Sequence, residues 1–173
     1  RTKGEGETAV SAAFPGATIV RPSILFGPDD HFVQMFAGLI ASLPALPVFG
    51  PGARLQPVFV DDVAEAIGTI VADAATAGRI YEFAGPEVTT MLELNRRIAS
   101  AQGRARTFFE LPDAVSEAIP TLTGWLPGAP ISRDQWALLK AGNVASGPLP
   151  GLAELGVHAR PLGLFLDRWM VRF

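Results

Sequence analysis

The sequence predicts an α/β protein built on parallel strands. Short β-branched runs alternate along the chain with amphipathic segments, and three stretches carry the Ser/Thr/Asp-x-x-Glu/Gln spacing that begins helices. Parallel neighbours need crossover connections, which helices usually supply, so this order favours a parallel sheet covered by helices. Hydrophobic residues make up 49% of the 173 residues, so the chain can bury a core.

The first elements are a helix, a turn and a strand. The pattern of residues 2–14 is helical, Pro15-Gly16 ends it, and the β-branched run 18–20 predicts a strand. Pro22 lacks a backbone donor, so we expect regular pairing to stop near Arg21 and an irregular apolar segment to follow. Open α/β sheets bind their ligands at the carboxyl ends of strands, so this segment is the first candidate for a binding site.

The later elements follow from hydrophobic periodicity and turn residues. We expect a helix over 32–43, a loop over 44–57 with a short strand at 48–49, strands over 57–60, 79–85 and 107–110, and helices from 62, 90, 114, 132 and 161. The helices from 62, 90 and 132 each begin with a capping box.

Composition argues against several classes of function. The net charge is −3 and no cluster of Lys or Arg marks a phosphate-binding face, so nucleic acid is not an expected partner. The chain has no cysteine, and His31 and His158 lie far apart in sequence, so we expect no metal and no serine triad. No apolar run is long enough to span a bilayer, which favours a cytoplasmic location, with a peripheral position on the inner membrane as the alternative.

The start of the chain points to a longer protein. Arg1 lies inside a helical pattern, so we expect this chain to be a fragment. No Gly-x-Gly-x-x-Gly follows a first strand, and the Gly-Pro-Gly at 50–52 lies in a proline-rich loop. If the fold binds a dinucleotide, the half with the fingerprint lies outside this chain.

Four stretches carry a resemblance to a known family: RTKGEGE, FPGATIVRPSILFGPDD, QPVFVDDVAEAI and IYEFAGPEVTTMLELNRRI. In this order they resemble the C-terminal half of an extended or atypical short-chain dehydrogenase/reductase of the NAD-dependent epimerase/dehydratase family. The branch is the one related to the nucleotide-binding accessory subunit of respiratory complex I, and we expect a bacterial source. The resemblance implies the C-terminal part of a Rossmann-type doubly wound parallel sheet with a small α+β substrate-side lobe, and NAD or NADP as cofactor.

Lys3 matches the lysine of the family's catalytic Tyr-x-x-x-Lys, and the tyrosine would lie two residues before Arg1. In the family this lysine contacts the nicotinamide ribose and lowers the pKa of the tyrosine by placing a positive charge beside the phenolate. The resemblance therefore implies a catalytic and cofactor-binding role for Lys3. The alternative is a solvated helix lysine.

The segment after the first strand is the next region that the resemblance marks. It implies that Arg21, Pro22, Ser23, Ile24 and Phe26 lie near the nicotinamide, where a fixed apolar backbone shapes the pocket. The alternative, compatible with the first, is a rigid loop in which the apolar side chains pack in the core.

The chain departs from the family's sugar-nucleotide enzymes before the VDDVA helix. Those enzymes carry Arg-Asp-aromatic where this chain has Leu55, Gln56 and Pro57, and an isobutyl group cannot clamp a phosphate as a guanidinium does. This argues against a nucleotide-sugar substrate and fits the complex I-related branch. We take Arg54 and Gln56 as candidate substrate contacts.

Three titratable residues have two explanations each. His31 is a candidate substrate contact near the pocket rim, and an exposed histidine at a helix start is the alternative. Asp61 and Asp62 form a carboxylate pair, but their place before a helix favours capping.

The tail at 161–173 reads as an amphipathic helix with Leu162, Phe165, Leu166, Trp169 and Phe173 on one face. Docking onto its own lobe is the favoured explanation. Contact with a membrane surface or a respiratory complex is the alternative that the resemblance keeps open.

The residues divide into two parts, with 1–28 and 58–88 ending the nucleotide-binding domain and 29–57 and 89–173 forming the substrate-side lobe. We expect an NAD(P)-binding protein with oxidoreductase or epimerase chemistry on a small molecule, or a non-catalytic accessory subunit of a respiratory assembly. The chain alone should be inactive and should bind NADH and NADPH poorly in a calorimetric titration, because it lacks the fingerprint.

Overall fold

The computed structural model describes residues 2–123 and 133–173. Its helices are α1 (Thr2–Ala13), α2 (His31–Ser42), α3 (Val60–Ala72), α4 (Met91–Ala101), α5 (Asp113–Thr123), α6 (Arg133–Ala141) and α7 (Gly163–Met170), with 3₁₀ turns at Ala74–Thr76 and Ala153–Leu155. Its strands are β1 (Ile19–Pro22), β2 (Leu25–Phe26), β3 (Ala45–Val48), β4 (Arg54–Leu55), β5 (Val58–Phe59), β6 (Ile80–Phe83), β7 (Thr89–Thr90) and β8 (Thr107–Glu110).

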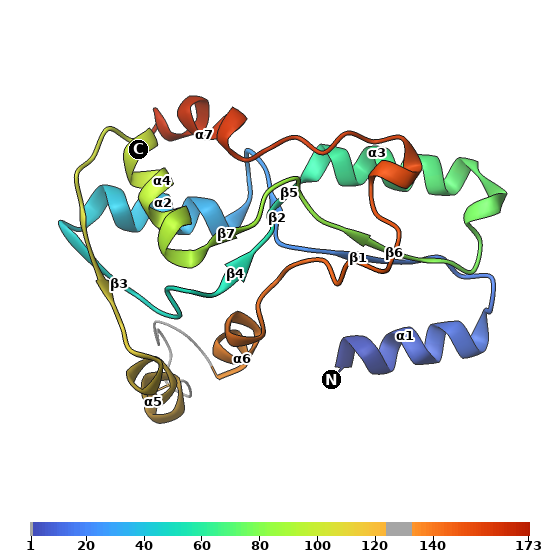
Figure 1. Ribbon diagram of the computed structural model, residues 1–173, viewed down its shortest axis with the longest axis horizontal. Helices are drawn as coiled ribbons and strands as arrows, with labels where there is room; N and C mark the ends of the chain where they lie inside the picture. The colour runs from blue at the N-terminus through green and yellow to red at the C-terminus, as the bar shows by residue number, and fades with distance from the viewer. Residues whose placement is uncertain (1, 124–132) are drawn as a thin grey trace.

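Parallel pairing dominates the described strands, as predicted. β1 pairs with β6, β2 with β5 and β3 with β8, all in parallel, while β4 and β7 are antiparallel. The β1–β6 register runs from Ile19 opposite Ile80 to Pro22 opposite Phe83, so both strands end at the same edge (Figure 1). The predicted α/β class is confirmed.

Strand β1 extends one residue further than expected, through Pro22. The backbone N–H groups of Ile19 and Ser23 donate to Arg79 O and Phe83 O at 2.9 and 2.8 Å. In a parallel pair alternate residues face the neighbouring strand, so the missing N–H of Pro22 points to the other side of β1 and β6 loses no bond.

The segment after Pro22 is also more regular than expected. Leu25 and Phe26 form the short strand β2 rather than an irregular stretch. Likewise, the loop expected over 44–57 holds two strands, β3 and β4, whose partners begin at Thr107 and Thr89. Pairing with distant strands sets these elements; the sequence predicted only a short strand at 48–49, which β3 overlaps at Val48.

The buried apolar side chains form two hydrophobic cores. The first core contains side chains of β2, α2, β3, β4, α4 and α7 together with Phe59 of β5. The second contains Val58 of β5 with side chains of α3, β6 and the segment 152–159. The predicted division of the chain remains a prediction: Phe26 and Phe59, from its nucleotide-binding side, pack in the first core, and 152–159, from its substrate-side lobe, packs in the second.

Helix α7 covers the first core with its apolar face. Leu162, Leu166 and Met170 are buried, and Phe165 stacks on Phe59 with ring centroids 4.3 Å apart. Docking of the tail onto its own lobe is therefore confirmed. No helix in the described parts of the chain is long and apolar enough to cross a membrane.

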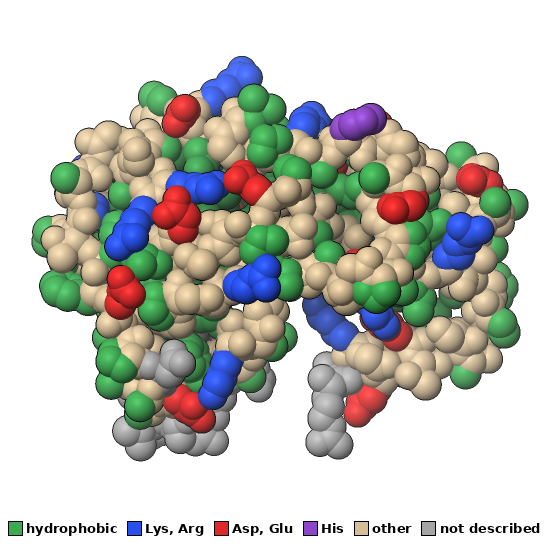
Figure 2. Space-filling model, in the orientation of Figure 1, with side chains coloured by type: hydrophobic (Ala, Val, Ile, Leu, Met, Phe, Trp, Pro, Cys, Tyr) green, Lys and Arg blue, Asp and Glu red, His purple; other side chains and the backbone are tan. Residues whose placement is uncertain are grey.

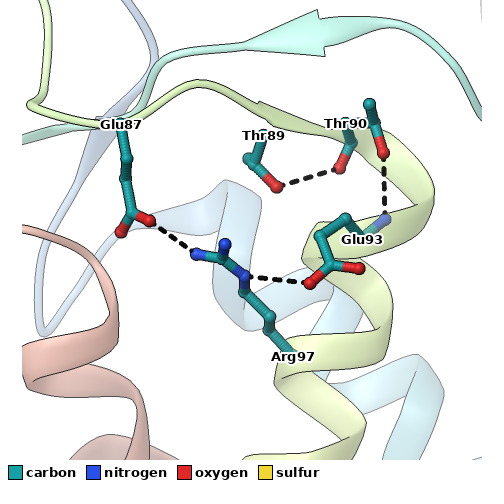
Figure 3. Close-up of polar contacts among 5 residues, drawn as sticks. All are labelled: Glu87, Thr89, Thr90, Glu93 and Arg97. Atoms are coloured by element: carbon teal, nitrogen blue, oxygen red, sulfur yellow. Dashed lines mark hydrogen bonds and ion pairs between the residues drawn. The ribbon is translucent and has the colours of Figure 1, made fainter.

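Of the three predicted capping boxes, the one at Thr90 is confirmed and the one at Asp62 is wrong. The Thr90 hydroxyl accepts from the Glu93 N–H at 3.2 Å at the start of α4, beside Arg97, which bonds Glu87 and Glu93 (Figure 3). Asp62 does not cap α3, which starts at Val60 without a side-chain cap bond. The third capping box begins at residue 132, outside the described residues.

The carboxylate of Asp62 serves a distant partner instead. Its oxygens accept from the backbone N–H and the Nε of Arg160 at 2.7 and 2.6 Å, and only 1% of Asp62 is exposed. A buried carboxylate needs a compensating charge, which this arginine supplies. The contact fixes the segment before α7 to the first turn of α3.

Candidate functional site

A cavity of about 170 Å³ lies at the carboxyl ends of β1 and β6. Three short segments line it: 21–23 at the end of β1, 82–84 at the end of β6, and 143–145 from the connection that follows α6. In the view of the figures, this edge lies above the hollow between α1 and the α5–α6 side of the molecule (Figures 1 and 2). The parallel register brings the first two segments together, because both strands end at the same level.

A polar network holds these segments together. The Ser23 hydroxyl donates to the backbone carbonyl of Gln56, and the Ser23 N–H donates to Phe83 O at 2.8 Å. The Asn143 side-chain oxygen accepts from Ile24 N at 2.6 Å, and its backbone carbonyl accepts from Gln56 N at 2.9 Å. Residues separated by as many as 119 positions thus meet at one edge.

Charged groups of both signs border the cavity. Arg21 is one of the lining residues, and its guanidinium donates to both carboxylate oxygens of Glu7 on α1, with the shortest distance 2.6 Å. This hydrogen bond lowers the pKa of Glu7 and raises the pKa of Arg21. On the other strand, Glu82 accepts from the backbone N–H of Ser146 at 2.6 Å.

Lys3 is exposed and lies on the same helix face as Glu7, because residues four apart are neighbours on a helix. Helix α1 runs antiparallel to β1, so its first turn lies toward the carboxyl end of that strand (Figure 1). Lys3 is not among the residues that line the cavity.

The other predicted cofactor contacts occupy two environments. Arg21, Pro22 and Ser23 line the cavity. Ile24 is half-buried against the first core and offers its N–H to Asn143, whereas Phe26 has no exposed surface and packs against Phe59 and Phe165. Phe26 thus occupies the packed position that the alternative interpretation of this segment described.

The predicted substrate contacts lie outside the cavity lining. His31 is the exposed first residue of α2, directly after the N-cap Asp30. Arg54 is exposed on β4, and its backbone carbonyl accepts from Asn143 N at 2.8 Å. Gln56 lies next to the cavity lining, and both ends of its side-chain amide are hydrogen-bonded to backbone groups of the protein.

Sequence reasoning missed the contribution of residues 82–84 and 143–146. Glu82 and Asn143 have no local motif around them, and their roles depend on segments 64 and 119 residues away. The glycines Gly142 and Gly147 bracket the second segment, but they signal turns only.

A second cavity of about 310 Å³ lies on the other side of the loop after β6. Residues 84–86, 152–153 and 157–159 line it, and Ala84 borders both cavities. Its lining is mainly apolar, with His158 as its one titratable side chain.

Comparison with known proteins matches residues 1–125 to the family model described as RmlD substrate binding domain. The chain is 34% identical over 167 residues to subunit 9 of the NADH dehydrogenase [ubiquinone] 1 alpha subcomplex of Rattus norvegicus, covering 95% of this chain and 44% of that protein. It is 32% identical over 148 residues to dTDP-4-dehydrorhamnose reductase of Mycobacterium tuberculosis, covering 80% of this chain and 45% of that protein. The chain thus spans less than half the length of these relatives, and the rat protein gives no support to the bacterial source that we expected.

Solved structures show the same fold. A nucleoside-diphosphate-sugar epimerase of Staphylococcus aureus superposes with a TM-score of 0.67 at 17% identity, over 95% of this chain and 56% of that one. The dTDP-4-dehydrorhamnose reductase of Bacillus anthracis, solved in complex with NADP, gives 0.55 at 15% identity, over 90% and 48%. At these identities the likeness establishes the fold of Rossmann-type epimerases and reductases.

Proposed function

The chain belongs to the RmlD substrate binding domain family, and from this premise we propose that it forms part of an NAD(P)-binding, reductase- or epimerase-like protein. Residues 1–28 and 58–88 are its nucleotide-binding side, and residues 29–57 and 89–173 are its substrate-side lobe. The single observation that carries the proposal is the cavity at the shared carboxyl edge of β1 and β6, because open α/β sheets bind ligands there.

The residues around the cavity suit the nicotinamide end of the cofactor. Pro22, Phe83 and Ala84 supply apolar or backbone surface, and Ser23 and Asn143 add polar groups, which together match the mixed lining of cofactor pockets. The bound cofactor would supply hydride transfer. The sequence has no Gly-x-Gly-x-x-Gly after a strand, so these residues would contact only the nicotinamide end of the dinucleotide.

Lys3 is the proposed link between the cavity and chemistry. Its place on the Glu7 face of α1, toward the carboxyl end of β1, supports a role at the ribose. A tyrosine two positions before Arg1 in the intact protein would support catalysis. Any other residue there would favour a binding role.

Titration of the ¹⁵N-labelled chain with NADH, followed by NMR, tests the proposal. We expect weak binding that shifts the amide signals of Ser23, Phe83 and Val144, while AMP, which lacks the nicotinamide, leaves them unchanged. Shifts confined to the second cavity, or no shift at millimolar NADH, would refute the proposal.

A second candidate function is an accessory subunit of a respiratory assembly that contacts the membrane peripherally. The observation in its favour is the 34% identity to a subunit of the rat NADH dehydrogenase complex over 95% of this chain. Native electrophoresis of the tagged intact protein distinguishes the two. Migration with the NADH dehydrogenase complex supports the accessory role, and migration as a free protein that reduces dTDP-4-dehydrorhamnose with NADPH contradicts it.

A further inference from the structure

One wall of the first cavity is a segment with little regular structure of its own. Residues 143–146, here called the wall segment, lie between Gly142 and Gly147, whose φ angles of +76° and +96° favour glycine. A single isolated bridge joins Asn143 to Leu55. Hydrogen bonds that involve a side chain, either of the wall segment or of another element, therefore help to hold the wall segment in place.

Three hydrogen bonds that involve a side chain tie the wall segment to other elements, one through its own Asn143 and two through side chains elsewhere. The Asn143 Oδ1 accepts from Ile24 N at 2.6 Å, Ala145 N donates to Gln56 Oε1 at 3.0 Å, and Ser146 N donates to Glu82 Oε2 at 2.6 Å. The bond from Gln56 is the central one along the segment.

The side chain of Gln56 bridges a backbone donor on one segment and a backbone acceptor on another. Its Oε1 accepts from Ala145 N, and its Nε2 donates to Gly85 O at 2.8 Å. An ionised carboxylate can only accept and an ammonium can only donate, so a neutral amide is the group that satisfies both partners. The pattern of partners also fixes which end of the amide is which.

Gly85 brings the second backbone within reach. A Cβ at this position would lie 1.8 Å from the backbone oxygen of Pro57, so only glycine permits this approach. The Gly85 N–H also donates to Gln56 O at 3.4 Å. The loop after β6 thus packs directly on the backbone that carries Gln56.

We propose that Gln56 is the positioning residue of this cavity, which fixes the wall segment to the loop after β6 through the two ends of its amide. Gln56 contacts no ligand in this role. It sets the distance between the 143–145 and 82–84 linings, and the identity of what enters between them rests on the proposed function.

Exchange of the Ala145 amide hydrogen in the ligand-free chain, measured by NMR against the wild type at the same pH, tests the proposal. Gln56→Glu should lower the protection of Ala145 about ten-fold at neutral pH, because the carboxylate faces Gly85 O. Acidification should restore it, because a protonated carboxyl donates and accepts as the amide does. Arg21, Glu7 and Glu82 also border the site, so the wild type at each pH is the reference.

Two further variants complete the test. Asn143→Asp keeps the oxygen that accepts from Ile24 and should leave Ala145 protected at both pH values. Gln56→Met removes both bonds without adding charge, and its Ala145 protection should stay low at every pH even if Gln56→Glu does not fold.

Unchanged protection of Ala145 in Gln56→Met, or no recovery of a folded Gln56→Glu in acid, would overturn the proposal. These results do not depend on NADH. If the wall loosens as expected but NADH never shifts the cavity amides, the proposed function fails and the positioning role of Gln56 stands.

Discussion

The ion pair between the buried Asp62 and the exposed side chain of Arg160 makes a quantitative prediction, because its two partners differ in exposure. Asp62 is 1% exposed, whereas 41% of the Arg160 side chain is exposed and its guanidinium carbon lies 4.5 Å from the centre of the Phe59 ring. Removing the exposed partner leaves a buried charge, but removing the buried partner leaves an arginine that water can reach. The two alanine substitutions should therefore differ in cost.

Arg160→Ala should destabilise the fold by about 3 kcal/mol. An uncompensated buried charge costs about 3–5 kcal/mol, and the lower end applies because the N–H of residue 160 still donates to the carboxylate. Asp62→Ala should cost about 2 kcal/mol, mainly from the backbone N–H left without its acceptor. The arginine contributes little to this second cost, because an exposed charge is readily solvated.

Urea unfolding followed by circular dichroism measures both values, provided that the m-value is unchanged. The double variant should cost less than the sum of the two single ones. Glu110→Gln is the matched control, because its pair with Arg96 is long, at 3.9 Å, and more than half exposed, so its cost should be near zero. Equal costs for the two alanine variants, or a larger cost for Asp62→Ala, would refute this account of the pair.

Two other predictions concern the cavity edge. The hydrogen bond from Arg21 lowers the pKa of Glu7, so the stabilisation from this pair should be present above the ordinary glutamate pKa and lost as pH falls through the lowered value. NMR titration of the Glu7 carboxyl should show a lowered midpoint that returns to normal in Arg21→Gln. An unchanged midpoint in this variant would contradict the pairing. Gly85→Ala should destabilise the fold by about 1–3 kcal/mol in a thermal unfolding assay, because its Cβ would overlap the backbone oxygen of Pro57. Gly52→Ala, with open space around it, should cost little in the same assay. Similar melting temperatures for the two variants would show that the backbones of residues 57 and 85 can separate.

Much of the fold could be predicted from local patterns. Helix α4 follows from its periodicity and from Thr90, whose hydroxyl needs no partner beyond the next turn. The strand at 107–110 and the helix beginning near 114 follow from similar signals. These elements depend on residues a few positions apart, which is the range that sequence periodicity reports.

The errors arose where a distant partner decided the outcome. Asp62 has the spacing of a capping residue, but its oxygens bond a residue 98 positions later. Strand β4 forms because β7 pairs with it, and the proline-rich sequence around it indicates only a loop. Neither partner could be identified from the neighbouring residues.

The candidate site was predicted in part for the same reason. Residues 21–23 stood out because a proline follows a β-branched run at a strand end. The wall segment and Glu82 contribute through backbone groups and single side chains, which carry no motif. Gln56 was selected from the family's pattern as a substrate contact, and only the hydrogen bonds reveal that both ends of its amide have protein partners.

The assembly of the cavity from three remote stretches has a consequence for biosynthesis. Ile24 and Asn143 are 119 positions apart in the sequence, and such non-local contacts form slowly. A ribosome that has released β1 and β6 but not yet residue 145 carries a nascent chain with an unfinished pocket. Ligand capture would therefore report a late stage of maturation, after β1 and β6 have already been synthesised.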